Sequence, residues 1–147
     1  MNGFKRIIQK INRKAKVLDV GAWGLEGENT SQYIEERFKN VVFMNIKAIP
    51  KVTLVDDFYK HKFSERFDLI VLDMPQKNNT ERDWTNKGLK RVAKLLRDGG
   101  IFITFLQTEQ EYQDVDASKL FDLFAIYPEN RRKDIIWIAL KRKQSGL

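Results

Sequence analysis

Residues 16–27 have the sequence KVLDVGAWGLEG. The first five, Lys16–Val20, form an apolar run around a single aspartate, which predicts a buried strand. Glycine then recurs at every third position from Gly21 onward, and the residues Asn29-Thr30-Ser31 can cap a helix that extends to about Asn40. The segment therefore predicts a strand, a glycine loop and a helix in that order. Such a loop lets a ligand approach the backbone closely.

The pattern of short apolar runs and helical spacings continues along the rest of the chain. The other predicted elements are an amphipathic first helix over 3–14, strands at 41–46, 52–55, 67–72 and 101–106, a helix on Leu89, Val92, Ala93 and Leu96 that ends at Asp98-Gly99-Gly100, a helix near 115–123, and strands near 124–127 and 134–140. Only residues 128–133, with a turn at 128–130, separate the last two strands, which is too short for a helical crossover, so we expect them to pair antiparallel. The fold class is α/β: one domain over 1–147, with a mostly parallel seven-stranded sheet, an antiparallel last strand and helices on both faces.

The composition excludes several classes of protein. A chain of 147 residues with 42% hydrophobic residues can bury a core of its own. It has no cysteine and a single histidine, His61, which excludes disulfide scaffolds, thiol nucleophiles and zinc sites built on cysteine or histidine. Apolar runs such as Ile135–Leu140 are too short to cross a bilayer, and the first residues lack the apolar centre of a secretory signal. We expect a soluble, cytoplasmic protein.

The net charge of +7 is concentrated near the two ends. Residues 1–16, with the predicted basic amphipathic helix, carry six basic and no acidic side chains, and residues 131–147 carry six basic and one acidic. Residues 17–130 carry 15 basic and 19 acidic side chains. If the two basic segments lie on one side of the fold, they form a positive patch for a polyanion, with RNA as the favoured partner. The alternative is that both segments are simply solvated.

Four motifs at predicted strand ends occur in a characteristic order, and ligands of open α/β sheets lie beyond those ends. They are VLDVG (17–21), DDF (56–58), FDLIVLD (67–73) and LRDGG (96–100). Over nearly the whole chain this set resembles the class I S-adenosylmethionine-dependent methyltransferases, which implies a Rossmann-like methyltransferase fold and S-adenosylmethionine as the cofactor. The resemblance assigns to the cofactor Asp19, Gly21, Ala22, Trp23 and Gly24 (methionine part), Asn45 (ribose), Asp56, Asp57 and Phe58 (adenine), and Asp73.

Two positions depart from that family's pattern. Trp23 stands where these proteins commonly have a second glycine, so its indole either crowds the cofactor or forms a wall of its pocket. At the ribose position the family commonly has a carboxylate, whereas Asn45 offers one acceptor and one donor group. We expect the loss of a charge-assisted bond to weaken cofactor binding by about 1–3 kcal/mol.

A narrower similarity is to the FtsJ-type ribosomal-RNA ribose 2′-O-methyltransferases. It is carried by DMP (73–75), TSQY (30–33), Phe4-Lys5 and the segment from Gly99 to Lys143. Those enzymes place a lysine, an aspartate, a second lysine and a glutamate around the target hydroxyl. The resemblance assigns catalytic roles to Lys5, Asp73 and Asp134. The second lysine is missing, and Thr104 or Phe105 takes its place.

The missing lysine leaves the catalytic prediction open. A ribose hydroxyl is a poor nucleophile near neutral pH, and a lysine held by carboxylates can orient it and help remove its proton. Either Lys5 acts with Asp73 alone, or Lys77 moves in, or the site is slow or silent.

We therefore carry three hypotheses. The first is a methyltransferase that acts on RNA, with the ribose 2′-oxygen as one possible target. The second is a silent protein of the same fold that binds nucleic acid or a partner protein. The third, a nicotinamide-dependent reductase, lacks both the glycine spacing and the acidic residue after the second strand. We predict no metal site, since the family uses Asp56, Asp57 and Asp73 without one.

Overall fold

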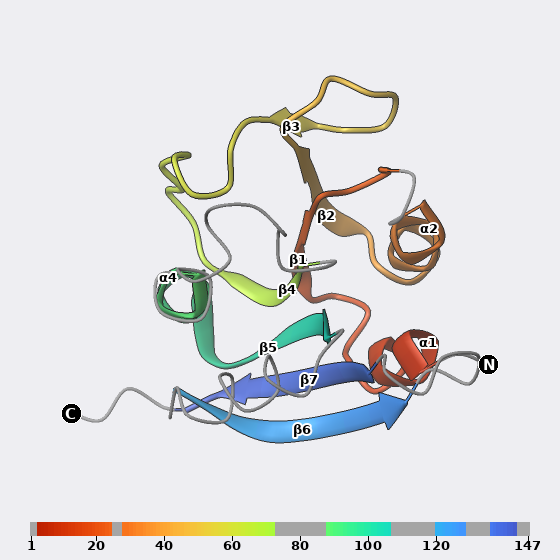
Figure 1. The fold of residues 1–147 in the computed structure, drawn as a ribbon, viewed down its shortest axis with the longest axis vertical. Helices are drawn as coiled ribbons and strands as arrows, with labels where there is room; N and C mark the ends of the chain where they lie inside the picture. Colours follow the sequence, from red (N-terminus) through yellow and green to blue (C-terminus); the bar gives the residue numbers. More distant parts are fainter. Residues whose placement is uncertain (1–2, 25–27, 73–87, 107–119, 129–135, 144–147) are drawn as a thin grey trace.

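The computed structural model describes residues 3–24, 28–72, 88–106, 120–128 and 136–143 (Figure 1). Its strands in chain order are β1 (Lys16–Val20), β2 (Asn40–Asn45), β3 (Leu54–Val55), β4 (Phe67–Leu72), β5 (Leu96–Leu106), β6 (Phe121–Pro128) and β7 (Ile136–Arg142). Its helices are α1 (Gly3–Ile8), α2 (Glu28–Arg37) and α4 (Leu89–Leu95).

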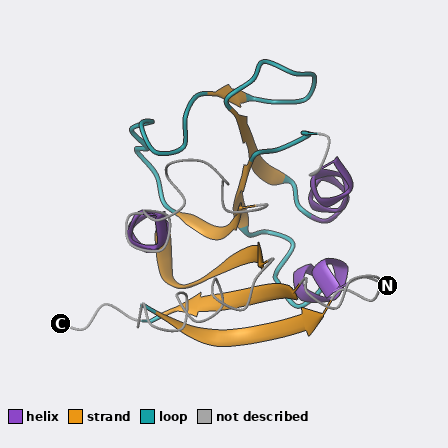
Figure 2. Cartoon of the chain, in the orientation of Figure 1, coloured by secondary structure: helices purple, strands orange, loops and turns teal. Residues whose placement is uncertain are grey.

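All of these strands belong to one sheet with the order β3-β2-β1-β4-β5-β7-β6 (Figure 2). The strands from β3 to β5 run parallel, and β7 runs antiparallel to both of its neighbours, β5 and β6. This confirms the predicted mostly parallel sheet and its antiparallel last strand. Because the parallel strands share a direction, their carboxyl ends meet at one edge of the sheet, and their amino ends meet at the opposite edge.

Helices cover both faces of this sheet, with α1 and α2 on one face and α4 on the other (Figure 1). Side chains alternate along β1, so that Val17 packs in the core under α1 and α2 while Leu18 packs in the core under α4. Fully buried residues such as Leu69 and Phe102 each contribute about 1.5–3 kcal/mol through burial. The mainly apolar segments β1 and β4 form strands at their predicted bounds because both of their faces are covered.

The first helix ends earlier than predicted, at Ile8 instead of residue 14. The chain tightens there, since the N–H groups of Lys10 and Ile11 bond to carbonyls only three residues back. The guanidinium of Arg37 on α2 donates to the carbonyls of Gln9 and Ile11, which satisfies acceptors that a longer helix would use.

The predicted helix near 115–123 is wrong at its end, because Phe121–Leu123 belong to β6. Phe121 pairs with Arg142 across the hairpin, and its ring lies 6.0 Å from that of Phe102. This long-range pairing outweighs local helical spacing. Residues 115–119 and 129–130 of the predicted helix and turn lie outside the described residues.

Strand β5 begins at Leu96, five residues before its predicted start. The register to β4 shifts between Phe67 and Leu69, and Gly99 accommodates this irregularity with φ +77°. Glycine adopts that left-handed conformation without the clash that a Cβ introduces. The segment that the sequence predicts as the end of a helix is therefore a kinked strand.

Candidate functional site

The glycine loop after β1 is fastened to the end of β2. The backbone N–H groups of Gly21 and Ala22 both donate to the carbonyl oxygen of Met44, each at 2.9 Å. Gly21 has φ +78°, which favours glycine. A Cβ added at Gly21 would meet no atom within 4 Å, so the chain turns beside open space at the carboxyl edge of the sheet. A ligand can approach the backbone at this point.

A buried carboxylate holds the same loop from the side of α2. Asp19 is only 1% exposed, and its Oδ2 accepts a hydrogen bond of 2.8 Å from the hydroxyl of Ser31. The Ser31 oxygen in turn accepts the backbone N–H of Trp23 at 2.9 Å. Asp19 therefore acts on the loop through Ser31. Ser31 lies inside α2 and is not its N-cap as predicted, and its link between Asp19 and Trp23 was not foreseen from the sequence.

Trp23 adopts φ +61°, a conformation that is strained for a residue with a side chain. This explains why glycine suits the position. Its ring packs against Phe43 of β2, with centroids 5.3 Å apart, and under the ammonium of Lys51, at 4.4 Å. The indole thus lies against the sheet face that carries α1 and α2, and it leaves the space beside Gly21 open. The indole therefore does not fill the space beside Gly21, and its predicted place in the wall of the cofactor pocket stays a prediction.

Asn45 at the end of β2 bridges two loops. Its Nδ2 donates to the carbonyl of Ala22 at 2.9 Å, and its Oδ1 accepts the N–H of Lys47 at 3.0 Å. The same Nδ2 lies 3.9 Å from the Cβ position of Gly24, which places Gly24 beside the asparagine. The amide therefore ties the glycine loop to the turn after β2, and an aspartate could not make the bond to Ala22.

The residues after β3 form a tight turn next to Asn45, because the N–H of Asp56 donates to the Asn45 carbonyl at 3.1 Å. The carboxylate of Asp57 accepts the N–H of Tyr59 at 2.9 Å. Asp56 pairs with Nδ1 of His61 at 2.8 Å, and this bond, together with the N–H of Asp57, holds the pKa of Asp56 below its ordinary value of 3.8.

Phe58 lies in the core under α4 and is 5% exposed. Its ring contacts Tyr59, and the guanidinium of Arg91 lies 5.3 Å from its centroid. Arg91 also donates to the carbonyl oxygens of Phe58 and His61, which anchors the turn after β3 to α4. Phe58 therefore packs in the core beneath the turn after β3, and its predicted role at the adenine stays a prediction.

The predicted catalytic residues are only partly within the described structure. Lys5 on α1 places its ammonium 5.2 Å from the ring centroid of Tyr33. The neighbouring Phe4 lies 5.0 Å from Trp137, which pairs with Phe105 near the carboxyl end of β5, so Lys5 lies toward that edge. Asp73 and Asp134 lie outside the described residues.

The place of the missing lysine is filled by packed side chains. Thr104 is fully buried, and its hydroxyl donates to the carbonyl of Leu72 at 3.0 Å. Phe105 packs against Trp137, with centroids 4.6 Å apart. Neither position presents an amino group.

Solved structures with a similar fold cover nearly the whole chain. The N-methyltransferase NodS from Bradyrhizobium japonicum WM9 superposes with a TM-score of 0.73 at 12% identity, over 96% of this chain and 93% of that one. Its complex with S-adenosyl-L-homocysteine gives 0.70 at 11% identity, over 97% and 89%. An rRNA methylase from Streptococcus thermophilus gives 0.65 at 11% identity, over 95% and 94%. This chain has a methyltransferase fold. No protein-family model and no curated protein matches the sequence.

The donors and acceptors at the carboxyl edge of this methyltransferase fold are chemically suited to S-adenosylmethionine. Gly21 leaves space for a ligand beside the backbone, and Asn45 and Asp57 bring oxygen acceptors to the ends of neighbouring strands. The residue set fits the cofactor, with an amide in place of a carboxylate at the ribose position.

Within the described residues, no three carboxylate or histidine side chains gather into a set suited to a metal ion. Among the same residues, no helix has both the length and the apolar character that a membrane span needs.

Proposed function

We propose that this chain is an S-adenosylmethionine-dependent methyltransferase that acts on RNA. The observation that carries the proposal is the methyltransferase fold together with three residues at the ends of the adjacent strands β1, β2 and β3. Gly21 leaves open space beside the backbone, and Asn45 and Asp57 carry side-chain oxygen acceptors. In an open α/β sheet that edge is where a ligand binds.

The cofactor, when bound, supplies a methyl group that is activated by the positive charge of its sulfonium. The protein's own task is then mainly alignment. The loop at Gly21 admits the methionine part, Oδ1 of Asn45 accepts from the ribose, and the turn at Asp57 receives the adenine. The bonds from Ser31 and Asn45 fix this loop before any ligand arrives, so little ordering accompanies binding.

RNA is supported as the methyl acceptor by charge. The chain carries a net +7, and lysines from both basic segments, Lys10, Lys14 and Lys141, line one groove. Lys5 is the residue we propose to orient the acceptor, with Asp73 and Asp134 as its carboxylate partners. The similarity in fold to a solved rRNA methylase agrees with this choice, and the ribose 2′-oxygen is the atom we propose.

The second candidate is a silent protein of the same fold that binds RNA without turnover. The buried Thr104 favours it, since its hydroxyl is already bonded to Leu72 and no lysine stands in its place. The two candidates differ in one measurement, transfer of a labelled methyl group.

Calorimetry with S-adenosylmethionine and S-adenosylhomocysteine tests the cofactor. We expect both to bind, and failure of both at millimolar concentration overturns the proposal. Transfer of a tritiated methyl group to RNA then separates the enzyme from the silent protein. Lys5→Met should lower the transfer rate while cofactor affinity stays the same, and an unchanged rate rules out the role of Lys5.

A further inference from the structure

A groove of about 480 Å³ lies at the amino edge of the sheet, opposite the proposed cofactor site. It is bordered by the loop between α1 and β1, by the start of β5, and by β6 and β7. The side chains that matter here are Lys10, Lys14, Asp68, Asp98, Phe124 and Lys141. The two basic segments that are far apart in the sequence thus meet at one hollow.

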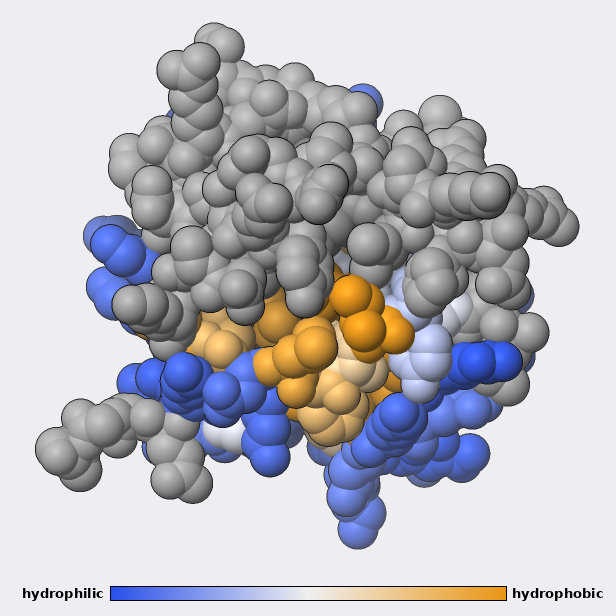
Figure 3. All heavy atoms as spheres, turned by 60° about the horizontal axis from the view of Figure 1, so that its bottom comes forward, coloured by the Kyte–Doolittle hydropathy of each residue, from blue (hydrophilic) through white to orange (hydrophobic). Residues whose placement is uncertain are grey.

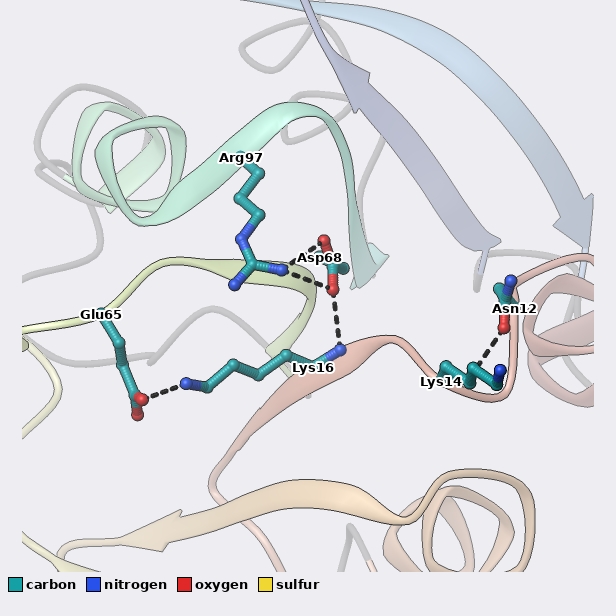
Figure 4. A network of polar contacts seen from close by, with 6 residues as sticks. All are labelled: Asn12, Lys14, Lys16, Glu65, Asp68 and Arg97. Atoms are coloured by element: carbon teal, nitrogen blue, oxygen red, sulfur yellow. Dashed lines mark hydrogen bonds and ion pairs between the residues drawn. The ribbon is translucent and has the colours of Figure 1, made fainter.

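The acidic residues of this groove are neutralised by arginines. Asp68 accepts from the guanidinium of Arg97 at 3.0 and 3.1 Å and from the backbone N–H of Lys16 at 2.9 Å (Figure 4). Asp98 pairs with Arg142 at 2.7 Å. Both carboxylates therefore have cationic partners and do not compensate the lysines.

The lysines of the groove have no carboxylate partner among the described residues. Lys10 donates to the hydroxyl of Tyr127 at 3.1 Å, and no ion pair joins Lys14 or Lys141 to an acidic side chain within the described ranges. Lys16, by contrast, turns away to pair with Glu65 (Figure 4). The groove therefore presents three cations to solvent and suits a chain of phosphates.

An aromatic side chain completes the groove. Phe124 lies at the point where the register between β6 and β7 shifts, and this irregularity leaves it 36% exposed. Leu123 and Ile126 of β6 are exposed as well, but they pair with Leu140 and Ile138 of the core under α4, whereas Phe124 lines the groove. Figure 3 shows hydrophobic residues gathered on this side of the molecule, with hydrophilic residues around them. A phenyl ring beside lysines is a platform on which a nucleic-acid base can stack.

We propose that this groove binds a single-stranded segment of RNA, with phosphates on Lys10, Lys14 and Lys141 and a base on Phe124. The proposal rests on RNA being the partner of the proposed enzyme, and it adds an anchoring site away from the methyl-transfer site. A base within a duplex is stacked on its neighbours and is not free for Phe124, so single strands should be preferred. Strand β1 rises about 3.3 Å per residue, which separates the two edges by about 17 Å, a span that one RNA can bridge.

Fluorescence anisotropy with a labelled RNA of about 12 nucleotides tests the three lysines. The triple variant Lys10→Gln, Lys14→Gln, Lys141→Gln is compared with Lys62→Gln, Lys90→Gln, Lys94→Gln, which loses the same charge from exposed positions outside the groove. The slope of log affinity against log salt should flatten by about 2 in the groove variant alone. Between 50 and 200 mM salt, the wild type should then weaken about 20-fold more than the groove variant. Equal slopes in the two variants overturn the proposal.

Phe124→Ala tests stacking, with Leu123→Ala as its control, because Leu123 is the neighbouring apolar residue and is more exposed, at 55% against 36%. The phenylalanine variant should bind single-stranded RNA about 5- to 150-fold more weakly, and duplex RNA unchanged. Equal losses in the two variants would contradict stacking on Phe124. A dimer in sedimentation that Phe124→Ala dissociates while RNA fails to bind would mean that Phe124 contacts a second copy instead. Cofactor calorimetry on the same variants should be unchanged. Failure of the wild type to bind the cofactor while RNA still binds the groove would refute the enzyme and keep the groove.

Discussion

Replacing Ser31 by alanine should destabilise the protein through two bonds that meet at one oxygen. The Ser31 hydroxyl donates to the buried carboxylate of Asp19 at 2.8 Å and accepts the N–H of Trp23 at 2.9 Å. A bond to a charged group contributes about 1.5–3 kcal/mol, and a buried N–H left unpaired costs about 1–3 kcal/mol. Trp23 is partly exposed to water, and Asp19 has a further interaction. The expected loss of stability is therefore smaller than the sum of these two contributions. We expect a loss of about 2–4 kcal/mol in unfolding free energy.

Urea denaturation followed by circular dichroism measures this loss. With an m-value of about 2 kcal/mol/M, the midpoint should fall by about 1–2 M. Gln32→Ala is the matched control, because Gln32 is the next residue on α2 and is exposed. It should change the unfolding free energy by less than about 0.5 kcal/mol.

A double-mutant cycle with Asp19→Asn tests the assigned partner. In the Asp19→Asn background the Ser31 bond is no longer charge-assisted, so Ser31→Ala should cost about 1 kcal/mol less than in the wild type. Two outcomes refute the reasoning: a stability of Ser31→Ala within 0.5 kcal/mol of the wild type, or a coupling of zero between the two positions.

Three further predictions concern the same edge of the sheet. Asn45→Asp should lower the unfolding free energy by about 1–3 kcal/mol, because a carboxylate cannot donate to the Ala22 carbonyl. It should nevertheless tighten the binding of S-adenosylmethionine in calorimetry, because it restores the carboxylate at the proposed ribose position, and weaker binding contradicts this account. The pKa of Asp56 is lowered by His61, so the stabilisation that the ionised carboxylate contributes is present above pH 3.8 and is lost as pH falls through a midpoint below that value. Carbon-13 titration should show that the midpoint rises toward 3.8 in His61→Ala. Trp23→Gly should lose about 1–2 kcal/mol in urea denaturation, since lost packing exceeds relieved backbone strain; a gain in stability would show that strain dominates.

The sequence is sufficient to predict the bounds of the central strands, and it is insufficient to predict those of the elements at the edges of the fold. Strands β1 and β4 match their predicted bounds because an apolar run covered on both faces has no competing structure. At the other end, the register of β6 depends on Phe121 meeting Arg142, which is 21 positions away, and no local pattern contains that information. The early end of α1 likewise depends on Arg37, a residue of another helix.

For the candidate site, the sequence locates the residues but not their bonds. Strand ends place Gly21, Asn45 and Asp57 at one edge, as predicted from parallel pairing. The sequence does not indicate that Ser31 lies between Asp19 and Trp23, because that contact needs the α2 helix to pack over β1. The sequence also does not locate the groove at the amino edge, because the groove depends on the positions of Lys10 and Lys141 in three dimensions.

The asparagine at the proposed ribose position should have a consequence beyond the weaker bond to the ligand that we expect. A carboxylate there would accept hydrogen bonds only, and it could not hold the Ala22 carbonyl of the glycine loop. Asn45 donates to that carbonyl while its oxygen accepts from Lys47, so the loop stays fixed to β2 without a ligand. A fixed loop loses less conformational freedom on binding, which offsets part of the missing charge. We therefore expect asparagine at this position to weaken one ligand contact and to pre-organise the site. Asn45→Asp reverses both effects at once, so calorimetry measures their net effect on binding, while urea denaturation measures the loss of the bond to Ala22 alone.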